Sequence, residues 1–319
     1  MLLKSRSTIL LAAASAALAG AMAATSAQAT ILATEDFGGV TLTGNTPVLL
    51  NGVNDGSGWS GAWYVQNGGT QSNGGPNGGT GIPGYNVSNV SPLAGADAGS
   101  NYATGGYQDD GSSRPFNLSP TGAFGAAGLI NGSGTIGVAG KTVLMSVLLA
   151  DGPSASNTLV ALGNSGASAL GYQPFANAGV GSYGNDHTVW NLSGGDGTST
   201  ITNVSSGLNV SSGTPVELVM EIQYTTGTAA NLSMWVNPTG YSDLNPTIPV
   251  ATPDATLAST DATFSYAFFF AAATGTGAKF TDFVVATPSS SSIPEPATLG
   301  LMAVMGTGLL LVGRKRKVA

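Results

Sequence analysis

Two glutamates four residues apart offer the clearest chemistry in this sequence: Glu217 and Glu221, in the segment ELVME. A protonated and an ionised carboxyl group that flank a glycosidic bond can hydrolyse it when they lie ~5–9.5 Å apart. In an extended strand at ~3.4 Å per residue, the two Cα atoms are roughly 13 Å apart. The pair can therefore act together only if its side chains converge over a concave surface. The alternative is a solvated strand face with two ordinary glutamates.

Other catalytic templates are largely excluded by composition. His187 is the only histidine, so a histidine-rich metal site is impossible and a Ser-His-Asp triad would have to use it. Cysteine is absent, which excludes disulfides, thiolate metal sites and a cysteine nucleophile. No cofactor is expected, with calcium left open because Asp109 and Asp110, like Asp55, Asp186 and Asp196, lie in turn-rich sequence. Ordinary turn chemistry accounts for these aspartates equally well.

Three tryptophans are candidates for carbohydrate binding, because an indole ring can stack on a sugar: Trp59, Trp63 and Trp190. Trp59 and Trp63 lie in a glycine-rich stretch, where exposure is plausible. In a β-sandwich, however, most aromatic side chains are part of the core. Stacking on sugar and packing in the core are thus both open.

Alternating hydrophobicity predicts the strands that would position these residues. Residues 216–224 place Val216, Leu218, Met220, Ile222 and Tyr224 on one face, and residues 142–149 and 231–236 show the same period of two. Residues 262–271 and 280–286 form two further, aromatic-rich runs. Since glycine and β-forming residues abound and no helical periodicity occurs between the two ends, we expect an all-β, two-sheet jelly-roll sandwich. Residues 66–84 are nearly low complexity and are expected to form a long loop.

Charge excludes one class of partner. Between Thr30 and Ser292 the chain has fifteen carboxylates and three basic residues, a formal charge near −12. Nucleic acid is therefore not an expected partner, because phosphate binding needs clustered lysine and arginine.

The N-terminal residues predict export. Lys4 and Arg6 precede an apolar region over residues 9–20, and Ala27-Gln28-Ala29 is a small-x-small cleavage site. We expect a signal peptide at residues 1–29, with Ala21-Met22-Ala23 as an alternative site, and engagement of the secretion machinery.

The C-terminal residues predict a membrane segment. Sixteen uncharged residues, 297–312, span roughly 24 Å as a helix at ~1.5 Å per residue, slightly less than the ~30 Å hydrocarbon core. We expect a short transmembrane helix over 297–313. The basic cluster that follows should stay in the cytoplasm and leave the rest of the chain outside; it consists of Arg314, Lys315, Arg316 and Lys317. A permanent membrane anchor explains this segment as well.

The motif Pro294-Glu295-Pro296, followed by the short apolar segment and a basic end, resembles the PEP-CTERM sorting signal. The resemblance implies recognition by an exosortase-type enzyme while the chain is held in the inner membrane. It also implies cleavage near the motif and transfer to the cell surface or its exopolysaccharide. We assign residues 287–292 as a serine-rich linker and 293–319 as the sorting signal.

The part between, residues 30–286, resembles the LamG-like, concanavalin A-like domains of such proteins. The resemblance rests on Glu35-Asp36-Phe37, on Gly56 to Trp63, on Leu232 to Pro238 and on the final Phe280 to Val285, where Thr281 and Phe283 depart from the usual pattern. It implies a jelly roll whose concave face sometimes binds carbohydrate and whose rim sometimes holds calcium.

The segment that holds Glu217 and Glu221 also resembles the Glu-x-Asp-x-Glu strand of laminarinases and lichenases, with Val219 in place of the central aspartate. In those enzymes the first glutamate is the nucleophile and the last is the acid/base. From sequence we therefore expect an exported surface or matrix protein that is not an enzyme and that binds polysaccharide. The alternatives are a divergent glycosidase and a structural matrix protein without a ligand.

Overall fold

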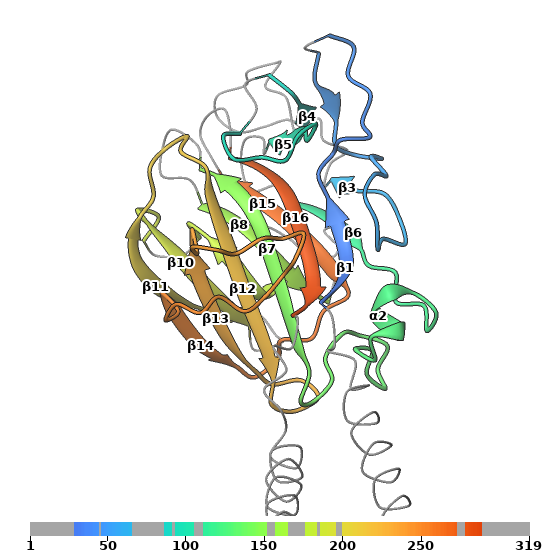
Figure 1. The fold of residues 1–319 in the computed structure, drawn as a ribbon, viewed down its shortest axis with the longest axis vertical. Helices are drawn as coiled ribbons and strands as arrows, with labels where there is room; N and C mark the ends of the chain where they lie inside the picture. The colour runs from blue at the N-terminus through green and yellow to red at the C-terminus, as the bar shows by residue number, and fades with distance from the viewer. Residues whose placement is uncertain are drawn as a thin grey trace, which may run out of the picture. The chain divides into compact units, whose positions relative to one another are not determined.

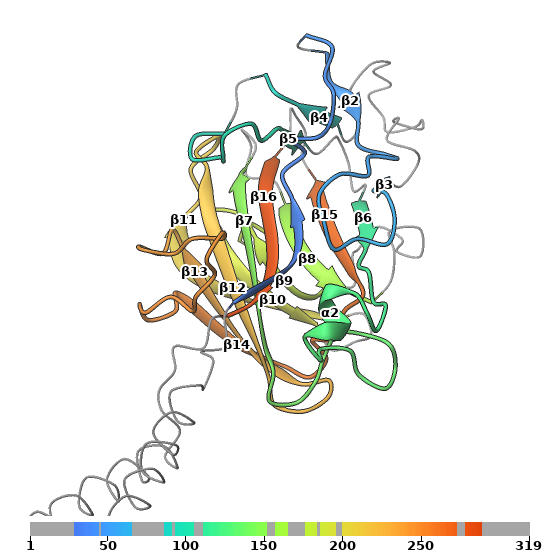
Figure 2. The same cartoon turned by 45° about the vertical axis from the view of Figure 1, so that its right-hand side comes forward.

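Two antiparallel β-sheets face each other in this protein (Figures 1 and 2). The structure is a computed structural model, which describes residues 29–44, 46–65, 86–90, 93–104, 111–151, 157–164, 176–183, 186–195, 200–272 and 278–288. The predicted signal peptide through Gln28, the loop at 66–84, Asp109, Asp110 and the whole sorting signal lie outside these ranges. Within them, no helix is both long and hydrophobic enough to span a membrane.

The first sheet contains nine of the described strands. Its hydrogen-bonded order is β14 (Ala255–Ser259), β13 (Ala230–Val236), β12 (Val216–Tyr224), β7 (Thr142–Ala150), β16 (Lys279–Thr287), β5 (Tyr102–Thr104), β4 (Asn86–Ser88) and β2 (Val48–Leu49). The ninth strand, β1 (Thr30–Glu35), pairs with β16. Strands from the two ends of the described chain are thus neighbours inside this sheet.

The second sheet contains seven of the described strands. Its order is β11 (Ile201–Asn209), β10 (Val189–Gly195), β9 (Ala176–Gly181), β8 (Asn157–Gly163), β15 (Tyr266–Ala272), β6 (Gly111–Pro115) and β3 (Tyr64–Val65). The chain passes repeatedly from one sheet to the other, and α2 (Ala123–Ala126) is a single helical turn. The expectation of an all-β, two-sheet jelly-roll sandwich is confirmed.

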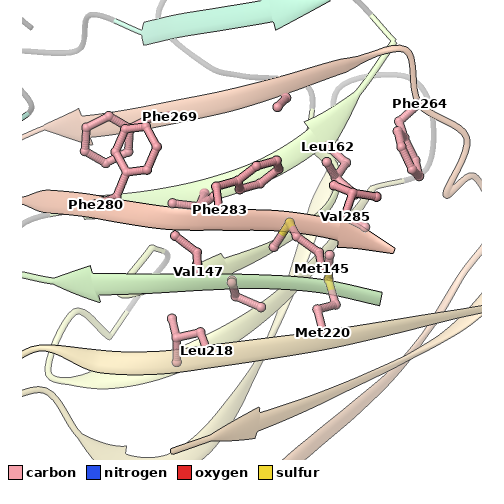
Figure 3. Close-up of a cluster of buried hydrophobic side chains, with 14 of the residues drawn as sticks. Met145, Val147, Leu162, Leu218, Met220, Phe264, Phe269, Phe280, Phe283 and Val285 are labelled. Atoms are coloured by element: carbon pink, nitrogen blue, oxygen red, sulfur yellow. The ribbon is translucent and has the colours of Figure 1, made fainter. Parts of the chain in front are cut away.

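The core lies between the sheets and follows the alternation of the sequence. In β12, Leu218, Met220 and Ile222 are fully buried in the main hydrophobic cluster. Figure 3 shows side chains of β7, β12 and β16 gathered with residues of the second sheet. Phe269 of β15 and Phe280 of β16 contact across the layers, with ring centroids 4.2 Å apart. Such close packing of aromatic rings is a main source of stability in a sandwich.

A β-bulge interrupts β16. Its register against β7 shifts between Thr281 and Val284, and Asp282 has a positive φ of 49°. Because of the extra residue, Phe280 and Phe283 both reach the core although they are three positions apart. Asp282 is left half-buried, away from that cluster.

The outer face of the nine-stranded sheet is partly covered by the connection between β13 and β14, residues 237–254 (Figure 1). This connection is fixed at its far end by two hydrogen bonds. The Trp235 indole donates to the Ala251 carbonyl at 2.7 Å, and the Val236 amide donates to the Asp254 carboxylate at 2.8 Å. We call residues 237–254 the cover loop.

Candidate functional site

A pocket of about 190 Å³ lies where the cover loop meets the outer face of the nine-stranded sheet. At the ~30 Å³ that one water occupies in the liquid, it has room for about six waters, on the scale of one sugar unit. Four of its eight lining residues are carboxylic acids and none is basic. The lining consists of Gly95, Asp97, Leu148, Glu217, Tyr241, Ser242, Asp243 and Asp282.

Glu217 reaches this pocket because the strand alternates. Leu218 points into the core, so its neighbour Glu217 points to the outer face of β12, where it is half-buried. The cover loop begins beside it, held by two hydrogen bonds between Asn237 and Glu217. The Asn237 amide donates to the Glu217 carbonyl, and the Glu217 amide donates to the Asn237 side-chain oxygen, both at 2.8 Å. This clamp places Tyr241 and Asp243 over the same stretch of sheet.

Asp282 enters the pocket from β16 through the bulge. Its carboxylate accepts a hydrogen bond from the Asp97 amide at 2.9 Å and one from the Ser100 hydroxyl at 2.8 Å. These two donors come from the loop before β5 and hold the carboxylate in one orientation. The pocket is therefore assembled from five separate segments of the chain: the loop before β5, β7, β12, the cover loop and β16.

The carboxyl groups of the pocket destabilise one another's ionised forms. Burial, and to a lesser extent the negative charges of Asp243 and Asp282, raise the pKa of Glu217 to about 7. Burial also raises the pKa values of Asp243 and Asp282, with repulsion from Asp97 adding to each. At neutral pH, Glu217 is thus divided between its protonated and ionised forms.

Glu221 is not among the residues that line the pocket. It shares the outer face of β12 with Glu217, but it lies between Leu144 of β7 and Ser233 of β13. Burial alone raises its pKa. The structure thus brings Glu217 together with Asp243 and Asp282 in one pocket, and not with Glu221.

Trp59 and Trp63 belong to a buried polar cluster instead of an exposed surface. Glu35 and Arg114, both almost completely buried, form an ion pair. The Trp63 indole donates to the Glu35 carboxylate at 2.9 Å, and the Arg114 guanidinium lies 4.7 Å from the centroid of a Trp59 ring. Burial raises the pKa of Glu35 to about 7, while Arg114 opposes this effect. The two tryptophans pack and satisfy this ion pair.

Trp190 is also unavailable to a sugar. Only 1% of its surface is exposed, and it lies in the main core between the sheets. The Trp59 ring stacks on Phe116 with centroids 4.8 Å apart, and Trp63 is 3% exposed. Trp63 and Trp190 are thus buried in the core, whereas Trp59 is half-buried, with its ring against Phe116 and the Arg114 guanidinium.

A second acidic group lies near the ion pair. Ligand oxygens of Glu35, Asp36 and Asp55 lie within 4.8 Å of one another. Asp55 is one of the aspartates considered for calcium from sequence. The backbone nevertheless already engages two of these residues, since the Gly38 amide donates to Asp36 at 2.9 Å and the Gly39 amide to Asp55 at 2.6 Å. Backbone hydrogen bonds and the positive charge of Arg114 therefore already stabilise these carboxylates, so their proximity does not require a metal ion.

Comparison with known proteins gives only weak similarities. No family model and no curated protein matches the chain. The globular domain of T. cruzi calreticulin is 10% identical with a TM-score of 0.42, covering 90% of this chain and 100% of that one. The CBM2 module of the evolved Dit of Lactobacillus casei BL23 phage J-1 is 12% identical with a TM-score of 0.33, covering 83% and 98%.

An endo-1,3-beta-glucanase from Streptomyces sioyaensis is 13% identical with a TM-score of 0.31, covering 78% of this chain and 99% of that one. Similarities at this level carry no argument about what this chain binds or does. The pocket itself is the basis for any functional proposal.

Sequence reasoning found one of the four pocket carboxylates. Asp97, Asp243 and Asp282 were missed, because each lies in a loop or bulge far from Glu217 in the chain. One signal was present in the sequence: Phe280 and Phe283 cannot both face the core of a regular strand, so a bulge at Asp282 was foreseeable.

Proposed function

We propose that this chain is an exported, surface-sorted protein whose jelly-roll sandwich binds polysaccharide in the acidic pocket beside the cover loop. The export and sorting part rests on the sequence of residues 1–29 and 293–319, in particular on Pro294-Glu295-Pro296 and the basic residues after the apolar segment. On this proposal an exosortase-type enzyme releases the protein from the membrane to the cell surface or extracellular matrix.

The pocket is the observation that carries the binding part. Ligand sites are concave and contain a few convergent polar groups. Ionised carboxylates form strong, charge-assisted hydrogen bonds with hydroxyl donors such as those of a sugar. No described residue donates a hydrogen bond to the Glu217 carboxylate, so its oxygens remain available to a ligand.

Binding is tested by titration calorimetry of the full chain, purified in detergent, against a panel of oligosaccharides. We expect saturable binding that Asp243→Asn weakens about tenfold, since it replaces one charged acceptor. Glu221→Gln is the matched control, because Glu221 lies on the same strand face outside the pocket. Absence of binding across the panel, or equal loss in both variants, would refute the proposal.

Sorting is tested separately. Replacement of Pro294, Glu295 and Pro296 by alanine should leave the chain in the membrane fraction of cells that hold an exosortase-type enzyme, at its unprocessed mass. A permanent anchor would give the same mass with and without the substitutions.

Hydrolysis of a glycoside is a second candidate, favoured by the pKa of Glu217. A carboxyl group with a pKa of about 7 can protonate a leaving group at neutral pH, and Asp243 or Asp282 would supply the second carboxylate. Release of reducing sugar that Glu217→Gln abolishes would support this candidate. Binding without release of sugar would indicate a carbohydrate-binding module. If neither binding nor release is found, the remaining interpretation is a structural matrix protein.

A further inference from the structure

We infer that the ligand of the acidic pocket carries a protonated amine, as the free amino sugars of a partly or fully de-N-acetylated hexosamine polysaccharide do. This inference rests on the proposed polysaccharide binding and names the class of sugar that the pocket selects. It follows from the charge of the pocket, from the unused oxygens on its wall and from their spacing.

The negative charge of the pocket has no counter-ion among the residues that line it. Asp97, Glu217, Asp243 and Asp282 all contribute a carboxyl group, and no lysine or arginine does. Each of the last three has a raised pKa in part because of a neighbouring carboxylate. A cation in the pocket would relieve this repulsion and favour the ionised forms.

None of the three basic residues of the described chain lines the pocket. Arg114 is paired with Glu35 in the core. Lys279 has its ammonium 4.4 Å from the centroid of the Tyr102 ring. Lys141 precedes the first residue of β7, seven positions before Leu148 of the pocket, or about 24 Å along the strand at ~3.4 Å per residue. The lining of the pocket thus contributes no cation, and a cationic ligand would balance its charge.

The pocket wall offers hydrogen-bond acceptors and no cationic side chain, which suits an amine. An ammonium group has three donors and no acceptor. Glu217 receives no hydrogen bond on its carboxylate from any described residue, whereas Asp282 is already oriented by Asp97 and Ser100. The Glu217 carboxylate, which accepts no hydrogen bond from a described residue, and the oriented Asp282 carboxylate are suited to hold an ammonium group between them.

A sugar amine fits the spacing better than a metal ion. Calcium needs several oxygens at 2.3–2.6 Å around one point. Among the described residues, only Glu35, Asp36 and Asp55 bring three ligand atoms within 4.8 Å of one another, and none of them lines the pocket. The pocket carboxylates are instead spread around a space of about 190 Å³, which a ring with one amine and several hydroxyls can fill.

The same charge excludes acidic sugars. A uronic acid would place a further carboxylate among the four that line the pocket, and like charges brought together out of water repel each other strongly. Neutral sugars would keep only the hydroxyl contacts. The expected order of affinity is therefore amino sugar, then neutral or N-acetylated sugar, then uronate.

The test compares oligosaccharides of equal length that differ in one group. Glucosamine, N-acetylglucosamine, glucose and uronate oligomers are titrated by calorimetry into the full chain in detergent, with a chelator and again with calcium. We expect the glucosamine oligomer to bind about 10- to 100-fold more tightly than its N-acetylated form, as for one charge-assisted hydrogen bond. Its binding alone should weaken as sodium chloride is raised, because salt screens charges.

Two variants locate the effect. Asp243→Asn on the cover loop and Glu217→Gln on β12 should each reduce the preference for the amine, and Glu221→Gln should retain it. Equal affinity for amine and N-acetylated oligomers would overturn the inference and leave the proposed function standing. Binding that requires calcium would also overturn it, in favour of a metal-bridged site. No binding of any oligomer would refute the proposed function itself.

Discussion

Replacement of Glu217 by glutamine should make the protein more stable above neutral pH. Burial and the charges of Asp243 and Asp282 raise the pKa of Glu217 from 4.5 to about 7. The folded state therefore binds this proton more tightly than the unfolded state does. The contribution of Glu217 to the free energy of unfolding is therefore largest at or below about pH 4.5. It falls as the pH rises to 7 and stays reduced above that. Glutamine has the same shape and cannot ionise, so it removes the penalty.

The size of the effect follows from the two pKa values. At about 1.4 kcal/mol per pKa unit, the difference between 4.5 and about 7 is worth roughly 3 kcal/mol. Because Glu217 is only half-buried and water screens its charge, we reduce this figure to about 1–2 kcal/mol. A domain of this size changes its melting temperature by about 2–4 °C per kcal/mol. We expect Glu217→Gln to melt roughly 2–8 °C above the wild type at pH 8.

The assay is thermal unfolding of the wild type, Glu217→Gln and Glu221→Gln at pH 4.5 and pH 8. The advantage of Glu217→Gln should be small at pH 4.5 and full at pH 8. Glu221→Gln should gain less, because burial alone raises the Glu221 pKa. A Glu217→Gln variant that is no more stable than wild type at pH 8, or that gains equally at both pH values, would refute the reasoning about the pocket charges. Gained stability with lost ligand binding is typical of a functional residue.

Two further predictions concern the scaffold. Arg114→Met should lower the free energy of unfolding by about 3–5 kcal/mol because it leaves the buried Glu35 without its partner, and adding Glu35→Gln should restore much of it; denaturant unfolding checks this, and equal loss in the single and double variants would contradict it. Gly58→Ala should destabilise the protein more than Gly44→Ala in the same assay. Both glycines have positive φ, but a Cβ at Gly58 would lie 2.1 Å from the Leu32 carbonyl, whereas nothing lies within 4 Å at Gly44.

The fold class was predictable from sequence because several strands, such as residues 216–224 and 142–149, show their buried face as a local alternation of hydrophobic residues. The alternation in 216–224 predicted the buried face and both bounds of β12. The run at 262–271 was less accurate, since β15 begins only at Tyr266 and the residues before it form isolated bridges and a bend. Sheet order was beyond the sequence, because it depends on pairings between distant strands such as β1 and β16.

The site was much less predictable. Trp59 and Trp63 looked exposed because glycines surround them, yet those glycines let the chain pass close to β1, where the Gly58 backbone approaches Leu32. The rings then pack on the ion pair of Glu35 and Arg114. No local sequence pattern predicts that these two distant residues pair. Glu217 was identified by spacing, but the residues that share its pocket were not, because loops and a bulge have no periodicity to read.

The pairing of β1 with β16 decides how the protein would carry a mechanical load. Thr30 lies opposite Thr287 and is hydrogen-bonded to it, so the described chain begins and ends at the same place inside the nine-stranded sheet. If the segment after Pro288 holds the protein at a surface, a pulling force acts first on the end of β16. That strand is hydrogen-bonded to both β7 and β1. Asp282 of the pocket lies on this same strand. A load applied between the pocket and that segment would thus act in part along β16, which holds both Asp282 and the end of the described chain.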